Sequence, residues 1–197
     1  MYYFMIVRRA ILGIVAVCGF VAAGISLQGP ARVTCDIQFD LALKILAFDR
    51  NLADRVGEEL VFGILYQGDL PPSLQVKAEM ERAIAFSAIK KVDGIPVREI
   101  AVDLSKITRW ERELKYAGVD VVFLAPLKDG SLEKVVTLCR RLKLTSISSL
   151  PEYPSGGAAI GFEPSGDKPI IVINLTAARE EGADFDSRLL RLARVIR

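Results

Sequence analysis

The segment Val119–Ala125, with the sequence VDVVFLA, is the stretch that predicts the fold most clearly. It is short and almost entirely apolar, which is typical of a strand buried on both faces of a sheet. Strand and helix periodicities alternate on either side of it. Further strands are expected at 59–66, 96–104 and 144–149, and helices at 73–89, 105–116 and 131–142. Because this alternation requires crossover connections, we predict an α/β fold with a mainly parallel sheet flanked by helices in Rossmann-like layers.

Both ends of this central region carry other elements. An amphipathic helix is expected at 36–52, where apolar residues recur three or four positions apart. Beyond Pro151, the apolar runs 157–162 and 170–174 are separated by EPSGDKP, whose turn-forming residues predict a C-terminal antiparallel hairpin. Two short terminal helices should follow, at 176–181 and 187–196.

The first 31 residues have the layout of a secretory signal peptide. Arg8 and Arg9 precede a charge-free run over residues 10–27, and small residues follow. This run lies near the lower length limit for a bilayer span, so an uncleaved anchor is an open alternative to cleavage. Either alternative exports residues 32–197, which we expect to form a single domain.

The composition excludes several classes of function. The chain has 197 residues and no histidine, so Ser-His-Asp and Cys-His catalytic groups and histidine-ligated zinc are absent. Its 26 basic and 24 acidic residues nearly balance, which leaves little electrostatic drive for binding polyanions. We therefore expect no catalytic residues, no cofactor, no metal and no nucleic-acid partner.

The most specific motifs lie in the last quarter of the chain. A Gly-Gly pair leads into an apolar strand that ends in Gly-Phe; a hairpin, an Ile-Asn-Leu strand end, an Ala-Ala-Arg helix and a Leu-Leu-Arg-Leu-Ala helix follow. In this order they resemble the C-terminal signature of the YfiR/HmsC family of small periplasmic proteins. The motif residues assigned structural roles are Gly156, Gly157, Gly161, Asn174, Arg179 and Leu190.

The resemblance implies a non-catalytic periplasmic regulator. Its expected partner is an inner-membrane signalling protein, a diguanylate cyclase of the YfiN type or a sensor kinase, with effects on cyclic di-GMP and biofilm formation. A homodimer is a further expectation. Redox-controlled relatives carry cysteines near the Gly-Gly pair, whereas residues 150–162 contain none here.

The C-terminal hairpin is the candidate partner surface, through Ile160, Phe162 and Glu163. Strand alternation places Ile160 and Phe162 on the same face, so both face a partner or both face the core. Gly157 and its neighbour should permit a positive φ or a close backbone approach. Asn174 is expected to cap the short helix that follows, with a ligand contact as the alternative.

Two other hypotheses stay open at this stage. Cys35 and Cys139 form a disulfide or remain two free thiols, because sequence does not give their separation. The alternative function is a periplasmic small-ligand binding domain serving a transporter or sensor. Its site would lie at the carboxyl ends of the strands, near residues 67–72 and 126–130.

Overall fold

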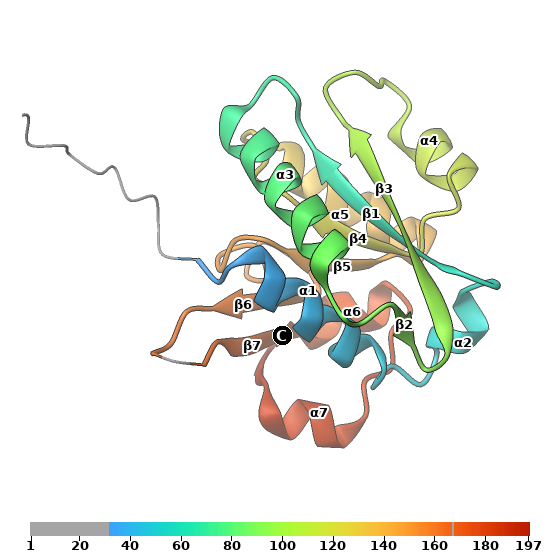
Figure 1. Ribbon diagram of the computed structural model, residues 1–197, viewed down its shortest axis with the longest axis vertical. Helices are drawn as coiled ribbons and strands as arrows, with labels where there is room; N and C mark the ends of the chain where they lie inside the picture. Colours follow the sequence, from blue (N-terminus) through green and yellow to red (C-terminus); the bar gives the residue numbers. More distant parts are fainter. Residues whose placement is uncertain (1–31, 167) are drawn as a thin grey trace, which may run out of the picture. The chain divides into compact units, whose positions relative to one another are not determined.

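The computed structural model describes residues 32–166 and 168–197 of the chain (Figure 1). The expected signal peptide at 1–31 lies outside the described residues. Within them, no helix is long and apolar enough to cross a bilayer. The strands form one sheet in the order β2-β3-β1-β4-β5-β6-β7-β8.

The centre of the sheet is parallel, as the alternating pattern predicts. Its four neighbouring strands are β3 (Ile95–Asp103), β1 (Leu60–Tyr66), β4 (Val121–Leu124) and β5 (Thr145–Ser148). The connecting helices are α3 (Pro71–Phe86), α4 (Trp110–Tyr116) and α5 (Ser131–Leu142). The predicted fold class is confirmed.

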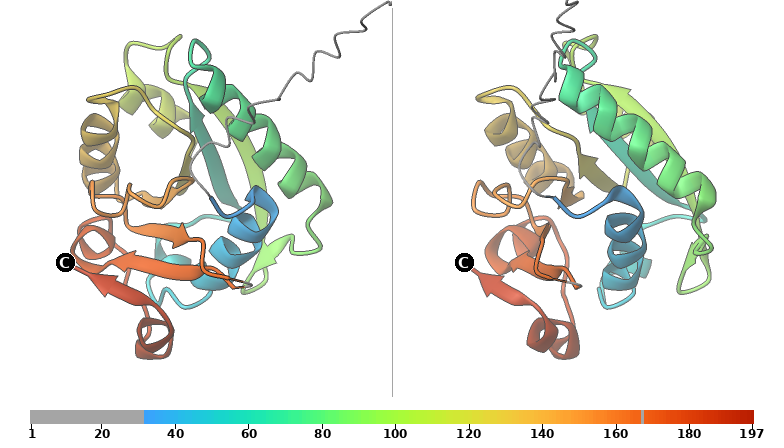
Figure 2. Two further views of the ribbon diagram at one scale, coloured as in Figure 1. Left: turned by 90° about the vertical axis from the view of Figure 1, so that its left-hand side faces the viewer. Right: turned by 60° about the vertical axis from the view of Figure 1, so that its left-hand side comes forward.

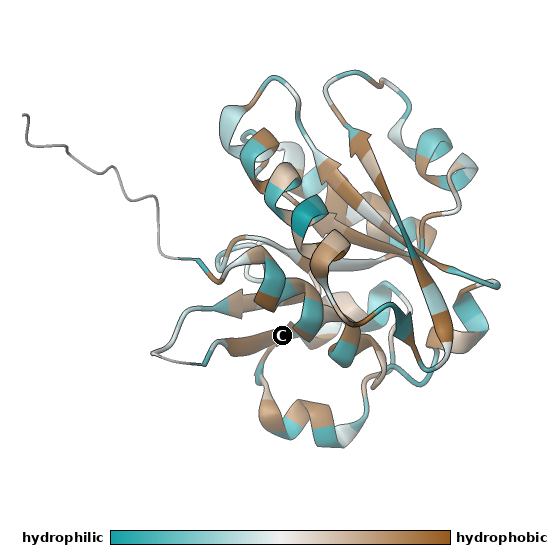
Figure 3. Ribbon diagram, viewed as in Figure 1, coloured by the Kyte–Doolittle hydropathy of each residue, from teal (hydrophilic) through white to brown (hydrophobic). Residues whose placement is uncertain are grey.

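Two hydrophobic clusters occupy the two faces of this sheet. Phe62 of β1 packs with Phe39 of α1 (Cys35–Leu46) in an edge-to-face contact of 5.3 Å between ring centroids. Its neighbour Val61 points to the opposite face, into the cluster that contains Leu138 of α5. Helices α1 and α3 therefore cover one face, and α4 and α5 cover the other (Figure 2). Figure 3 shows β1 and β3 as largely hydrophobic, whereas the helices alternate between hydrophobic and hydrophilic residues.

The C-terminal part adds the predicted hairpin and one strand that was not predicted. Strand β6 (Ile160–Glu163) pairs parallel with β5 and antiparallel with β7 (Ile170–Asn174). Helices α6 (Leu175–Glu180) and α7 (Ser187–Leu192) follow. The last helix does not reach residue 196 as expected, because Arg194–Ile196 form β8, which pairs with β7. The edge of β7 offers these residues hydrogen-bond partners, and the β-branched Val195 and Ile196 suit a strand.

The first half also departs from the predicted boundaries. Helix α1 ends at Leu46, and a short helix α2 (Leu52–Arg55) follows. Between them, the Asp49 carboxylate accepts the backbone amides of Asn51 and Asp184, so contacts with a distant segment turn the chain. Helix α4 begins at Trp110 instead of residue 105.

Strand β2 (Lys91–Val92) was not anticipated. It pairs antiparallel with β3 across a turn at Asp93 and Gly94, both of which have positive φ. Two consecutive positive φ values define the type I′ hairpin turn that Asp-Gly favours. The dipeptide was therefore a readable signal for this hairpin.

Candidate functional site

The hairpin residues expected to contact a partner belong mostly to the core. Ile160 and Phe162 are 0% and 1% exposed and pack in the same hydrophobic cluster as Phe39. The expectation that these two residues form a partner surface is therefore wrong. The shared face of β6 points inward, into the hydrophobic cluster that also contains residues of α1. Glu163 is partly exposed and forms an ion pair with Arg194 of β8.

The glycine motif before β6 serves a close contact and a turn. A Cβ added at Gly161 would lie 2.3 Å from Cγ of Pro154, whose ring cannot move aside as a flexible side chain would. Gly157 has φ +105°, a backbone conformation that favours glycine. Gly156 is also confined, because an added Cβ would lie 2.7 Å from Cδ2 of Leu132.

Asn174 joins the hairpin to the helix that follows it. Its Oδ1 accepts the backbone N–H of Ala177 at 3.0 Å, which makes it the N-cap of α6. Its Nδ2 donates to the carbonyl oxygen of Pro154 at 2.9 Å, which holds the loop before β6. Arg179 is exposed, and Leu190 is half-buried against the core. The described contacts of Gly161 and Asn174 are structural, and a structural role for Arg179 stays a prediction.

The strand ends proposed for a small ligand are linked by internal hydrogen bonds. Gln67, at the end of β1, accepts the backbone N–H of Lys128 at 2.7 Å and donates to Ser131 Oγ at 3.3 Å. Lys128 also forms an ion pair with Asp69. The topology thus brings residues 67–72 and 126–130 together, as expected, but their polar groups bond to one another.

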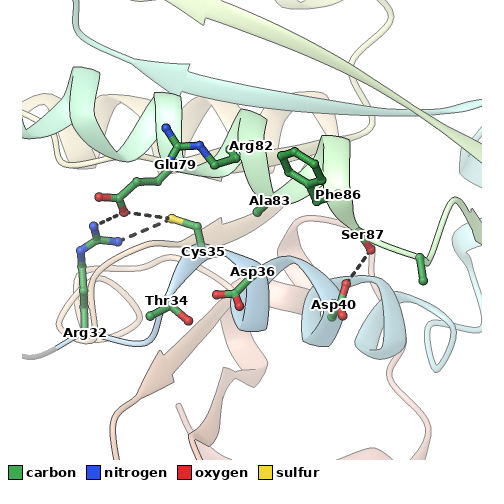
Figure 4. Close-up of a pocket in the computed structure, with 11 residues that line it drawn as sticks. Arg32, Thr34, Cys35, Asp36, Asp40, Glu79, Arg82, Ala83, Phe86 and Ser87 are labelled. Atoms are coloured by element: carbon green, nitrogen blue, oxygen red, sulfur yellow. Dashed lines mark hydrogen bonds and ion pairs between the residues drawn. The ribbon is translucent and has the colours of Figure 1, made fainter.

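The largest cavity among those described is a groove of about 780 Å³ between α1 and α3 (Figure 4). Side-chain contacts link the two helices at both ends of this groove. The Arg32 guanidinium forms an ion pair with Glu79 at one end. At the other end, Ser87 Oγ donates to Asp40 Oδ1 at 2.7 Å. We call this cavity the α1–α3 groove.

One exposed aromatic residue lies on the wall of the α1–α3 groove. Phe86, at the carboxyl end of α3, is 85% exposed, while Val76, Met80 and Ile84 of the same helix are buried. Phe86 lies off the apolar stripe formed by these three residues. A single exposed apolar side chain is common on protein surfaces, but this one borders a groove whose lining also includes charged residues of both signs. The sequence carried this signal, since Phe86 does not fit the helical spacing of that stripe.

The Cys35 thiol lies at one end of the α1–α3 groove and has low reactivity. Its Sγ lies 3.5 Å from Arg32 Nη1 and 3.7 Å from Glu79 Oε2. Burial raises the pKa of Cys35 to about 11, although Arg32 acts in the opposite direction. Burial would also raise the pKa of Glu79, but the hydrogen bonds from Arg32 and Gln75 outweigh it and lower that pKa. The thiol is therefore protonated at neutral pH and is a poor nucleophile.

The structure separates the two cysteines that were candidates for a disulfide. Cys35 packs in the cluster with Phe62, whereas Cys139 packs in the cluster with Val61 on the opposite face of the sheet. Both are buried free thiols. A disulfide requires Cα atoms within about 7 Å, and the sheet lies between these residues. The alternative of two free thiols is the one the structure supports.

We expect both thiols to resist alkylation in the folded protein and to react after unfolding without a reductant. Burial raises the pKa of both thiols, and for Cys35 the rise is from 9.0 to about 11. A rise of this size lowers the thiolate fraction about 100-fold at neutral pH. Mass spectrometry of peptides alkylated before and after urea treatment measures this. A Cys35–Cys139 peptide pair released only by reduction would contradict it.

The comparisons with known proteins agree with this architecture. A family model described as YfiR/HmsC-like (DUF4154) matches residues 71–194. A conserved domain protein from Vibrio cholerae O1 biovar El Tor has a similar structure, with a TM-score of 0.58 and 13% identity over 85% of this chain and 62% of that chain. The ligand-free, open structure of a substrate binding protein with adhesive properties from Clostridium difficile gives a TM-score of 0.52 and 13% identity, over 75% of this chain and 57% of that one.

These structural likenesses show the fold alone, because the identities are low. The chain spans only 57% to 62% of the length of the two solved structures. No match was found among the curated proteins.

Proposed function

The chain belongs to the YfiR/HmsC-like family, and from this premise we propose that it is a non-catalytic periplasmic regulator that binds an inner-membrane signalling protein. Its partner is a diguanylate cyclase of the YfiN type or a sensor kinase. By binding this partner, the chain represses or modulates signalling and so changes cyclic di-GMP levels and biofilm formation. Export through the N-terminal segment forms part of the same proposal.

The observation that carries the proposal at the residue level is the exposure of Phe86 on the wall of the α1–α3 groove. Aromatic residues are enriched among those that dominate binding energy at protein interfaces. The groove also presents charges of both signs, including Asp36 and Arg82, which suit the polar rim of an interface. The α1–α3 groove is therefore our proposed partner site, in place of the buried hairpin residues.

A non-catalytic role agrees with the chemistry of this groove. Its thiol is protonated at neutral pH, and the chain has no histidine to act as a base. The alternative function, ligand binding at the strand ends, has weaker support because Gln67 and Lys128 already bond to neighbouring groups there.

Replacing Phe86 with glutamate should abolish regulation while leaving the fold intact. Removing an aromatic side chain that becomes buried when the partner binds costs about 2 kcal/mol or more of binding free energy, which weakens binding about 30-fold. We expect cells that carry Phe86→Glu to show the same cyclic di-GMP level as cells lacking the protein. The measurement is cellular cyclic di-GMP after complementation of a deletion strain.

Tyr116→Glu is the matched control, because Tyr116 is 92% exposed and belongs to α4 on the opposite face of the sheet. It introduces the same charge and should complement fully, and thermal melting should show both variants folded. If deletion leaves cyclic di-GMP unchanged, regulation of a cyclase is wrong. If deletion changes it but Phe86→Glu complements fully, the α1–α3 groove is not the partner site.

A further inference from the structure

A second groove, on the opposite face of the sheet, is strongly cationic. It lies between α4 and α5, with a volume of about 610 Å³, and we call it the α4–α5 groove. Ten residues line it, of which five are cationic and one is acidic, an excess of four positive charges. The cationic residues are Arg109, Arg112, Lys115, Lys134 and Arg141. This excess is unusual for a chain whose basic and acidic residues nearly balance.

Glu111, the acidic residue among those that line the α4–α5 groove, pairs with two of the cations. The Glu111 carboxylate pairs with Lys115 Nζ at 2.9 Å on its own helix and with Arg141 of α5 at 2.5 Å. Glu111 therefore bridges the two helices and holds both cations at the groove. Arg112 also pairs with Glu113, which does not line the groove, so three of the positive charges of the groove remain uncompensated.

Two of the cations have no acidic partner. Within residues 32–166 and 168–197, neither Arg109 nor Lys134 forms an ion pair. Both are exposed, so their charged groups can reach a ligand.

The positions of these two cations do not stabilise their helices. Arg109 is the N-cap residue of α4, and Lys134 is the fourth residue of α5. The helix macrodipole is unfavourable to positive charge at this end of a helix. Arg141 differs, because it lies in the last turn of α5, where a positive charge is favourable. Arg109 and Lys134 therefore gain nothing from the helix macrodipole, and their charges are free to act on a ligand.

We propose that the α4–α5 groove binds a phosphate-bearing ligand through its phosphate group. Arginine offers a planar set of donors that matches phosphate oxygens, and the groove presents three arginines. A monocarboxylate would neutralise only one of the three uncompensated charges, whereas a phosphate ester or a row of phospholipid headgroups neutralises more. The volume is within the range of small-molecule sites. This site is separate from the proposed partner site, because α4 and α5 cover the other face of the sheet.

Trp110 provides a built-in reporter for this site. It is the only tryptophan of the chain, and it lines the α4–α5 groove. Its indole N–H donates to the carbonyl oxygens of Ile107 at 3.0 Å and Leu104 at 3.2 Å, which fix the ring in place. A phosphate held beside it should change its fluorescence emission.

The test is titration of Trp110 emission in the purified chain. One arm uses pyrophosphate and glycerol 3-phosphate, and the other uses phosphatidylcholine vesicles with and without phosphatidylglycerol. Sodium chloride at equal ionic strength corrects for general salt effects. Saturation by the soluble phosphates assigns a small phosphate compound, whereas saturation only by vesicles containing phosphatidylglycerol assigns the lipid headgroup.

The double substitution Arg109→Gln and Lys134→Gln should weaken this binding about tenfold, because two charge-assisted contacts are lost. The matched control is Lys44→Gln with Lys91→Gln, which removes the same charge from exposed lysines outside the groove and should leave the affinity unchanged. Neither Arg109 nor Lys134 pairs within the described residues, so the double variant should melt like the parent protein. Raising the salt concentration should also weaken binding to the unmodified chain, which tests the electrostatic origin without any variant. A chain that saturates with none of these probes, or a double variant that binds as well as the parent, would overturn the proposal.

Discussion

Replacing Phe162 with alanine should lower the free energy of unfolding by about 4 kcal/mol, because truncating a buried phenylalanine removes apolar burial and leaves a cavity. Phe162 is 1% exposed and packs in the cluster that joins the hairpin to α1. The midpoint of thermal unfolding should fall by about 10 °C for a domain of this size. Urea titration and thermal melting followed by circular dichroism measure both quantities.

Glu163→Gln is the control for this experiment. Glu163 is the next residue of β6, and its ion pair with Arg194 is partly exposed. Such pairs contribute about 1 kcal/mol or less, so this variant should melt close to the parent protein. An equally small effect of Phe162→Ala would contradict the core position of this side chain and restore it as a candidate partner residue.

The second large effect concerns Glu181, which is 0% exposed. Its Oε2 accepts the backbone N–H of Ser146 at 2.8 Å, and its Oε1 accepts the hydroxyl of the same serine at 2.7 Å. Burial raises the pKa of Glu181 from 4.5 to about 8, and the contacts with Ser146, Arg140 and Arg55 only partly oppose this. Between about pH 4.5 and 8, the carboxyl group of Glu181 is therefore protonated in the folded protein and ionised in the unfolded chain.

The free energy of unfolding should consequently fall as the pH rises from about 4.5 to about 8. Over that window the folded state binds more protons than the unfolded state, so removing protons favours unfolding. A shift of this size corresponds to a loss of up to roughly 5 kcal/mol. Urea titrations at several pH values measure it.

Glu181→Gln should flatten this pH dependence, because glutamine has the same shape as the protonated acid and does not ionise. Asp103 and Asp186, whose pKa values are lowered to about 2, affect stability in the opposite sense and at lower pH. Burial would raise the pKa of Asp103, but hydrogen bonds from Ser105 and Gly68 outweigh burial and lower that pKa. Hydrogen bonds from Arg188 lower the pKa of Asp186. If Glu181→Gln leaves the slope of the free energy of unfolding unchanged between about pH 4.5 and 8, another group causes the pH dependence.

The elements of the fold were largely readable from the sequence. Apolar runs such as Val119–Ala125 and the alternation of periods predicted the parallel sheet, and EPSGDKP predicted the hairpin. The position of Asn174 between a strand and a helix indicated its capping role. These predictions succeed because periodicity, turns and caps depend on residues that are close together in the chain.

The candidate site was much less predictable. The alternation in β6 showed that Ile160 and Phe162 share a face but not which way that face points, and the structure turns it toward α1. An ion pair between Arg32 and Glu79 links the two sides of the α1–α3 groove at one end. The buried carboxylate of Glu181 accepts its hydrogen bonds from Ser146. None of these partners is close in sequence.

The sequence by itself therefore determined the fold class, the hairpin and the family, because local patterns encode each of them. Only the tertiary structure decided which residues are buried, that Cys35 and Cys139 lie on opposite faces of the sheet, and that Arg194–Ile196 end the chain as a strand. The physical reason is that burial and charge pairing arise between segments far apart in the chain. Their free energies depend on how the layers pack, and no local pattern specifies that packing.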